Sequence, residues 1–400
     1  MKASLKIRLI IMMFLMFFTW GAWYGQMSKY LINQLNANGD EVGNAYMAFS
    51  LATIIAPFFV GMIADRFFSA QKVMGVLNFL GAGVIFLLIQ EKDPSVFFWY
   101  ILAYTMTFTP NLALANSIAM NHMANPDKEF PFIRVFGTIA WIVVTNIIGY
   151  YALGDSVYIF SISLVSSVVW GIYAFTLPDT PPTATGKTTL LDILGKDAFV
   201  LFKDRSFLIF FISSILICIP LSFYYSLANP ALTDTGMTFI ENKMSLGQVS
   251  EVLFMLALPF LYSRYGVKNI LIMGLAAWIL RFLCFGYGTI ETEWMLIIGI
   301  LLHGMSYDFF FVSGQIYTDA KAGPNIKNSA QSLITLGTYG IGMAIGSKIS
   351  GLVLQANTVK ENGQNVYDWL SIWLVPTYIA ILVLFLFIVF FKDNTRIKSA

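Results

Sequence analysis

Long apolar stretches separated by short polar ones run along the whole chain of 400 residues. Because an α-helix needs about 20 mainly apolar residues to cross a bilayer, each long stretch predicts one membrane span. The expected spans are 5–33, 42–64, 71–90, 95–121, 131–152, 155–177, 207–230, 244–262, 269–288, 292–318, 327–355 and 366–391. The pattern therefore predicts an all-α polytopic membrane protein with twelve transmembrane helices.

One long polar stretch, residues 178–206, interrupts this pattern near the middle of the chain. It predicts an N-terminal six-helix bundle over residues 1–177, a cytoplasmic linker over 178–206 and a C-terminal six-helix bundle over 207–400. The two halves resemble each other weakly, since each has an arginine followed by a lysine in the loop after its second span. Parallel six-helix repeats are typical of the major facilitator fold.

The basic residues predict the orientation of the chain. With the N-terminus inside, the inner segments are much richer in lysine and arginine than the outer loops. The lysines expected in outer loops are Lys29, Lys92, Lys243 and Lys360. Since cytoplasmic loops carry the excess of basic residues, both termini are expected in the cytoplasm.

Composition supports a membrane protein without enzymatic activity. The chain is 58% hydrophobic and only 12% charged, against about 25% charged in soluble proteins. Cys218 and Cys284 both fall in apolar stretches, which indicates neither a disulfide framework nor a metal site. The sequence G-K-T-T at 186–189 lacks the first glycine of a phosphate-binding loop, and no hydrolase motif occurs. We expect no metal and no other cofactor, and the proton gradient as the energy source.

A single arginine stands out in the fifth span, because an arginine at membrane depth needs a partner or a wet cavity. Pro131 is expected at the entry of this helix, and Arg134, Thr138 and Trp141 follow on one helical face. This face offers a fixed cation, a hydroxyl and an aromatic plane. We interpret it as a substrate-binding face.

Two carboxylates at membrane depth could balance the positive charge of Arg134. Gln248 and Glu251 share a face of the eighth span. Burial in the membrane raises the pKa of a carboxyl group, whereas a nearby arginine lowers it. Such a group can take up and release protons as its surroundings change, which is what a proton-coupled carrier requires. A permanent structural ion pair with another helix is the alternative interpretation of Glu251.

The tenth span carries the second carboxylate, Asp308, next to Tyr307 and one turn after His303. Asp308 is a second candidate for proton coupling, although it could also simply lock two helices together. His303 is either a proton relay or a neutral hydrogen-bonding side chain. We place His303 and Tyr307 among the substrate-binding residues.

The short loop after the second span contains Gly61, Asp65 and Arg66, which resemble part of the loop signature of the major facilitator superfamily. The second glycine and the following basic pair of that signature are missing. Arg264 has the corresponding place in the second half. These residues are expected to form a gate, while ordinary charged side chains at a helix end would give the same pattern.

Several motifs together resemble the bacterial nucleoside:proton symporters, which are nucleoside permeases of the major facilitator superfamily. The motifs are F-P-F-I-R-V-F-G-T at 130–138, Gln248 with Glu251, S-R-Y-G-V-K-N at 263–269, A-A-W-I-L-R-F at 276–282 and Y-D-F-F-F-V-S-G at 307–314. The likeness extends to W-G-A-W at 20–23 and L-G-K-D-A-F-V-L-F-K at 194–203. It therefore covers nearly the whole chain.

The resemblance implies that Arg134, Thr138, Gln248 and Glu251 contact the nucleoside, and that Trp141 replaces a phenylalanine of the family. Two departures concern the second half of the chain. Ser222 and Tyr225 stand where the family has a glutamine and an asparagine, and His303 stands in place of a tyrosine. These departures leave the preferred base, and even the substrate class, open.

The expected function is proton-coupled nucleoside import by alternating access, with the substrate bound between the two bundles near mid-membrane. The expected partners are a nucleoside, protons and the lipid bilayer of the bacterial inner membrane, without nucleic acid, and the expected state is a monomer. A symporter for another polar solute, such as a sugar or muropeptide, is the alternative. A membrane receptor is less well supported, because buried ionisable groups are costly without a transport pathway.

Overall fold

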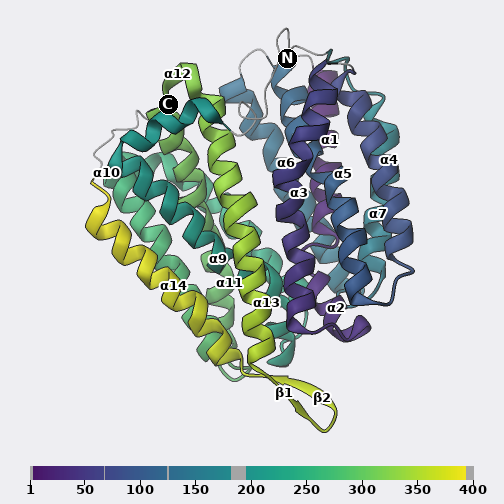
Figure 1. Cartoon of the computed structure of the whole chain (residues 1–400), viewed down its shortest axis with the longest axis vertical. Helices are drawn as coiled ribbons and strands as arrows, with labels where there is room; N and C mark the ends of the chain where they lie inside the picture. Colours follow the sequence, from purple (N-terminus) through teal and green to yellow (C-terminus); the bar gives the residue numbers. More distant parts are fainter. Residues whose placement is uncertain (1–2, 67, 124–125, 182–194, 393–400) are drawn as a thin grey trace. The chain divides into compact units, whose positions relative to one another are not determined.

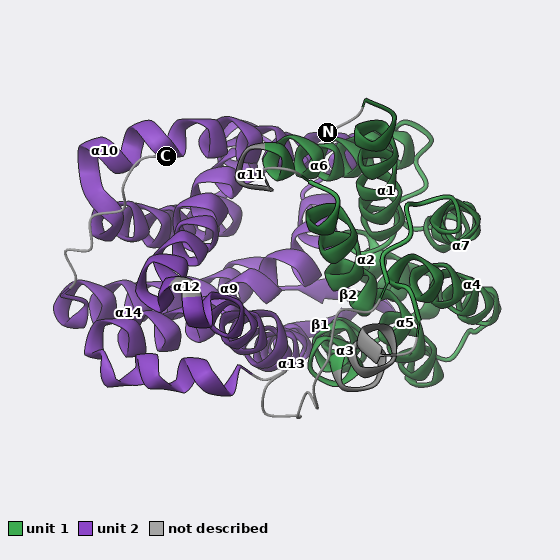
Figure 2. Ribbon diagram, turned by 90° about the horizontal axis from the view of Figure 1, so that it is seen from above, with its two compact units in different colours: residues 1–188 green, residues 189–400 purple. Residues whose placement is uncertain are grey.

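The computed structural model describes residues 3–66, 68–123, 126–181 and 195–392, and the side chains of 58–66, 126–128 and 324 lie outside this description. The chain divides into two compact units, residues 1–188 and 189–400 (Figure 2). The described residues are almost entirely helical, as expected. The six-helix bundles of 1–177 and 207–400 stay a prediction, and the boundary between the units falls within the expected linker.

Unit 1 consists of helices. They are α1 (Ala3–Gly21), α2 (Met27–Leu35), α3 (Gly39–Arg66), α4 (Ala70–Leu88), α5 (Pro94–Asn121), α6 (Pro126–Tyr150) and α7 (Tyr158–Ala174). Helices α1 and α6 pack against each other, as do α3 and α5 (Figure 1). Asp93 caps α5 by accepting a hydrogen bond from the Ser95 backbone, and Pro94 occupies the first turn, where no amide donor is needed.

The first expected span is broken, which the apolar pattern of residues 5–33 did not predict. Helix α1 ends at Gly21, and α2 begins at Met27. The Tyr46 hydroxyl donates to the Tyr24 carbonyl oxygen at 2.8 Å, so α3 satisfies a backbone acceptor that the interrupted helix leaves open.

The fifth span begins earlier than expected. Helix α6 starts at Pro126, and Pro131 lies inside the helix rather than at its entry. Either proline is compatible with a first helical turn, so the sequence alone did not identify the true start. The face that carries Arg134 is nevertheless helical.

Unit 2 is helical apart from one hairpin. Its elements are η1 (Lys196–Lys203), α9 (Arg205–Asp234), α10 (Ile240–Tyr287), α11 (Glu293–Tyr307), η2 (Asp308–Val312), α12 (Ser313–Thr335), η3 (Leu336–Gly342), α13 (Met343–Ala356), β1 (Thr358–Glu361), β2 (Gln364–Tyr367) and α14 (Trp369–Phe390). The segments η2 and η3 are π-helical, a widened geometry that is frequent at functional sites.

Two glycines reverse the chain direction inside elements that look continuous. Gly266 in α10 has φ 72° and Gly323 in α12 has φ 65°, which side chains with a Cβ rarely adopt. At 1.5 Å per residue the 48 residues of α10 would measure about 72 Å, far more than a bilayer core. The expected spans 244–262 and 269–288 therefore share α10, on the two sides of Gly266.

A β-hairpin, absent from the all-α expectation, projects from one end of unit 2 (Figure 1). Strands β1 and β2 pair antiparallel with Thr358 opposite Tyr367. Asn362 and Gly363 form the turn with φ values of 51° and 82°. Asn-Gly is the preferred dipeptide for such a two-residue turn, so a short-range signal for this hairpin was present in the sequence.

The described residues contain seven helices that are long and apolar enough to cross a membrane, and the expected number of twelve is not confirmed. They cover Ala3–Gly21, Ala70–Leu88, Glu129–Tyr150, Arg205–Asp234, Ile240–Tyr287, Glu293–Gly323 and Trp369–Phe390. Part of the difference between seven and twelve arises because α10 counts as one helix although it carries two expected spans.

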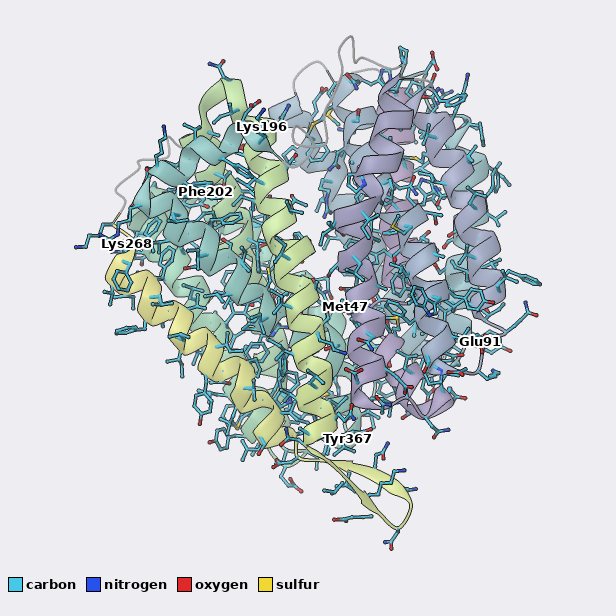
Figure 3. The ribbon with its side chains drawn as sticks, viewed as in Figure 1. Met47, Glu91, Lys196, Phe202, Lys268 and Tyr367 are labelled. Atoms are coloured by element: carbon cyan, nitrogen blue, oxygen red, sulfur yellow. The ribbon has the colours of Figure 1, made fainter. Side chains whose placement is uncertain are left out.

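The two ends of the expected linker make contacts in different units. In unit 1, the Gln71 side chain donates to the Asp179 carboxylate at 2.6 Å and accepts from the Thr180 amide at 3.0 Å. In unit 2, Ala198 of η1 packs against Ala330 and Leu333 of α12. Lys196 and Phe202 mark η1 in Figure 3.

Candidate functional site

Arg134 of α6 is half-buried and contacts α1 in unit 1. Its guanidinium carbon is 4.0 Å from the centroid of the Phe17 ring, a distance typical of a cation–π contact. Gly137, one turn along α6, makes room for this contact, since a Cβ there would lie 3.0 Å from Nη1 of Arg134. Thr138 is 8% exposed on the same helix. The expected cation and hydroxyl are therefore presented together by α6.

Trp141, the third expected residue of α6, belongs to an aromatic cluster. Its ring meets Trp20 of α1 edge to face, with centroids 5.4 Å apart. Trp20 in turn stacks on Phe49 of α3 at 5.0 Å and lies 5.8 Å from Phe108 of α5. Among the described residues the Trp20 indole nitrogen has no hydrogen-bond acceptor. Trp20 therefore joins the candidates, and the W-G-A-W motif was the only sequence signal for it.

In unit 2, a close crossing of α10 and α11 brings Glu251 to His303. The Gly304 amide donates to the Ser250 hydroxyl at 2.9 Å. A Cβ on Gly304 would lie 2.5 Å from the Glu251 backbone nitrogen, so only glycine permits this approach. As a result, Nε2 of His303 is 3.9 Å from a carboxylate oxygen of Glu251. Glu251 is 15% exposed and His303 only 2%.

Arg281 of α10, which is not among the predicted site residues, is part of the same cluster. The side chain is 0% exposed, and its guanidinium carbon lies 3.5 Å from the centroid of the Tyr224 ring. Its Nη1 atom is 3.0 Å from Nδ1 of His303 and 3.4 Å from the Ser306 hydroxyl. Tyr224 also stacks on His303, with centroids 5.1 Å apart. Tyr224 and Arg281 are thus neighbours of the candidate site that sequence analysis missed.

The two π-helical segments of unit 2 lie next to this cluster, and the rings of Phe311 in η2 and Tyr339 in η3 have centroids 6.5 Å apart. The Tyr307 hydroxyl is hydrogen-bonded to the Tyr339 hydroxyl of η3, and the Tyr307 ring lies 5.6 Å from His303. Asp308, the first residue of η2, is 0% exposed. Among the described residues neither of its carboxylate oxygens has a hydrogen-bond partner, so the expected partner from another helix is not found there.

The remaining predicted residues differ in how much the structure says about them. Gln248 is half-buried on α10, one turn before Glu251. Ser222 is buried and donates to the carbonyl oxygens of Cys218 and Met343, which is a structural use of its hydroxyl. Tyr225 is half-buried next to Tyr224.

The predicted gate residues are only partly described. Arg264 is exposed, with its guanidinium carbon 5.5 Å from the Tyr265 ring, immediately before the turn at Gly266. Gly61, Asp65 and Arg66 belong to the last turns of α3, and their side chains lie outside the described residues.

Comparison with known proteins identifies the family. The family model described as "Nucleoside H+ symporter" matches residues 1–396, which is nearly the whole chain. The chain belongs to the nucleoside H⁺ symporter family. This symporter is 39% identical to the putative nucleoside transporter YegT of Escherichia coli (strain K12), over 98% of this chain and 95% of that protein. It is 34% identical to the xanthosine permease of the same organism, over 98% of this chain and 97% of the permease.

Solved structures agree with this assignment. The crystal structure of the nucleoside transporter NupG matches the symporter with a TM-score of 0.86 and 30% identity, covering 98% of this chain and all of NupG. The crystal structure of a point mutant of NupG matches with a TM-score of 0.89 at the same identity. The symporter is therefore a membrane transport protein and not an enzyme, and the predicted family resemblance is confirmed.

Proposed function

We propose that this symporter imports nucleosides together with protons. The observation that carries the proposal is the pair formed by Glu251 and the buried His303, in which Nε2 of the imidazole lies 3.9 Å from a carboxylate oxygen. Nearly the whole chain that holds this pair matches the nucleoside H⁺ symporter family. A carboxylate that is mostly buried but still 15% exposed can reach both a ligand and a proton.

The substrate contacts that we propose are the predicted ones together with Trp20. Arg134 and Thr138 supply donors for base carbonyl oxygens, and the Trp141 ring supplies a stacking plane. Base–aromatic contacts of this kind are worth about 1–3 kcal/mol per base. In unit 2, Gln248 and Glu251 supply acceptors for ribose hydroxyls, beside His303 and Tyr307.

Proton coupling is proposed for Glu251 and Asp308. Burial of a carboxylate with no hydrogen-bonding partner disfavours its charged form, and Asp308 is fully buried and unpartnered among the described residues. The two carboxylates therefore have different surroundings, which allows different roles. Asp308 is suited to hold a proton, and Glu251 to contact the ligand.

The finer topology is also part of the proposal: a major facilitator fold with twelve spans, both termini in the cytoplasm of a bacterial inner-membrane protein, and a monomeric state. Basic residues support the orientation. Lys196 and Lys268 lie toward one end of unit 2, and Tyr367 of the hairpin lies at the other (Figure 3). The positive-inside rule assigns the lysine-bearing end to the cytoplasm.

The test is an uptake panel with the Glu251→Gln variant. Cells expressing the wild-type protein are expected to accumulate labelled uridine or adenosine, but not a labelled sugar, only while a proton gradient exists. Glu251→Gln removes the titratable group and keeps the size, so it should abolish accumulation while nucleoside counterflow can continue. Sugar accumulation without nucleoside uptake by the wild type would overturn the substrate assignment. Full uphill uptake by the variant at every external pH would remove Glu251 from proton coupling.

A further inference from the structure

The arrangement of Arg281, His303 and Glu251 fixes where the imidazole carries its proton. A guanidinium has only donors, so the 3.0 Å contact between Nη1 of Arg281 and Nδ1 of His303 requires Nδ1 to accept. A neutral imidazole that accepts at Nδ1 carries its proton on Nε2. A doubly protonated ring would place an N–H of Nδ1 against an N–H of Arg281, with two positive charges in contact.

The surroundings of Arg281 hold this cation in place. Its side chain is fully buried, with the Tyr224 ring 3.5 Å and the Trp278 ring 5.3 Å from its guanidinium carbon. Contacts between a cation and an aromatic face are attractive, and more strongly so when the cation is shielded from water. Nη1 also contacts the Ser306 hydroxyl, which donates to the His303 carbonyl oxygen at 3.0 Å. Arg281 is thus connected to the His303 side chain directly and to the His303 backbone through Ser306.

The proton on Nε2 faces Glu251. The distance of 3.9 Å between Nε2 and the carboxylate oxygen is too long for a direct hydrogen bond, which is about 2.9 Å. A hydroxyl oxygen that contacts both atoms at about 2.8 Å fits this separation. It would accept from Nε2 and donate its own proton to the carboxylate. With the other tautomer, Nε2 and Glu251 would both be acceptors.

We propose that Arg281 is a positioning residue that holds His303 in the Nε2-protonated tautomer, so that His303 and Glu251 form a donor–acceptor pair for a ligand hydroxyl. The pair selects a group that accepts and donates at once, as a sugar hydroxyl does. This inference rests on the proposed nucleoside transport for its ligand, but the tautomer itself can be measured without any ligand.

The first experiment reads the tautomer directly. The chain has only two histidines, so protein labelled with ¹⁵N-histidine gives signals from two rings, and His122→Gln identifies those of His303. At neutral pH the ¹⁵N shifts of the wild type are expected to show Nε2 protonated and Nδ1 unprotonated. A proton on Nδ1, or on both nitrogens, would overturn the proposal whether or not nucleosides are the substrate.

The second experiment links the tautomer to ligand selection. Arg281→Met removes the donor at similar length, and it should give a mixture of tautomers. The affinity for a ribonucleoside should fall at least tenfold, while its deoxyribose analogues lose less, so the ratio between them shrinks. Arg281→Lys keeps a donor and a charge and should restore most of the ratio. Arg205→Met, at an exposed arginine of unit 2, is the control and should change neither quantity.

A purely structural Arg281 would give a different result. Arg281→Met would then lower thermal stability but keep the Nε2-protonated ring and the same affinity ratio, and the proposal would be wrong. If the Met variant does not fold, the wild-type spectrum and Arg281→Lys still decide. Absence of nucleoside binding by the wild type would refute the proposed function and leave the tautomer measurement intact.

Discussion

Replacing Gly304 by alanine is expected to separate α10 from α11 and thereby weaken the Glu251–His303 pair. A Cβ on Gly304 would lie 2.5 Å from the Glu251 backbone nitrogen and 2.6 Å from the Ser250 carbonyl oxygen. Since atoms of this kind are in comfortable contact at about 3.5 Å, the helices must move apart by about 1 Å. The neighbouring atoms are backbone, so no side-chain rotation relieves the overlap.

Overpacking of this kind costs about 1–3 kcal/mol of stability. Nε2 of His303 and the carboxylate oxygen of Glu251, 3.9 Å apart, would shift relative to each other by a similar displacement, and hydrogen bonds to a ligand hydroxyl weaken when their distances and angles change. We expect the affinity for a ribonucleoside to fall at least tenfold, which is about 1.4 kcal/mol of binding free energy.

The assay is nucleoside binding to purified protein, with Tm measured on the same samples. Gly83→Ala is the matched control, because Gly83 is a helical glycine of α4 with nothing within 4 Å of the added Cβ. The control should bind as the wild type does, with equal or slightly higher Tm, since alanine favours helix over glycine. Wild-type affinity and wild-type Tm in Gly304→Ala would refute the reasoning from close helix contact.

Two further predictions concern other parts of the chain. Arg134→Lys keeps a cation near Phe17 but loses the planar fork, so nucleoside affinity should fall at least tenfold; unchanged binding with a collapsed Tm would instead indicate a structural role. In unit 2, a hydrogen bond from Lys321 at 2.7 Å lowers the pKa of Asp204, which caps α9. A carboxyl group whose pKa is lower in the folded protein than in the unfolded chain stabilises the fold at pH values above its ordinary pKa. The stability difference between wild type and Asp204→Asn should therefore be present above about pH 4 and vanish as the pH falls through the lowered pKa. The half-exposed pair should contribute only about 0.5 kcal/mol, and a difference that persists in acid would contradict this origin.

Sequence analysis alone determined the membrane class, the family and the helical faces that carry the candidate residues. Apolar stretches of bilayer length are a local property, because an α-helix that crosses a membrane satisfies most of its backbone hydrogen bonds within itself. The face of Arg134, Thr138 and Trp141 follows from helical periodicity in the same way. The break at Gly21 and the Asn-Gly hairpin are local too, although the apolar pattern concealed the first, and the second was simply not predicted.

The tertiary structure decided which residues of different helices meet. No pattern within α10 or α11 shows that Arg281 faces His303, because that contact depends on how the helix reverses at Gly266 and how closely Gly304 lets the two segments approach. Tyr224 was equally invisible, since only packing distinguishes it from the adjacent Tyr225. Periodicity places a side chain on a face of its own helix, whereas its partner is fixed by helix crossings that the sequence specifies only through the packing of the whole unit.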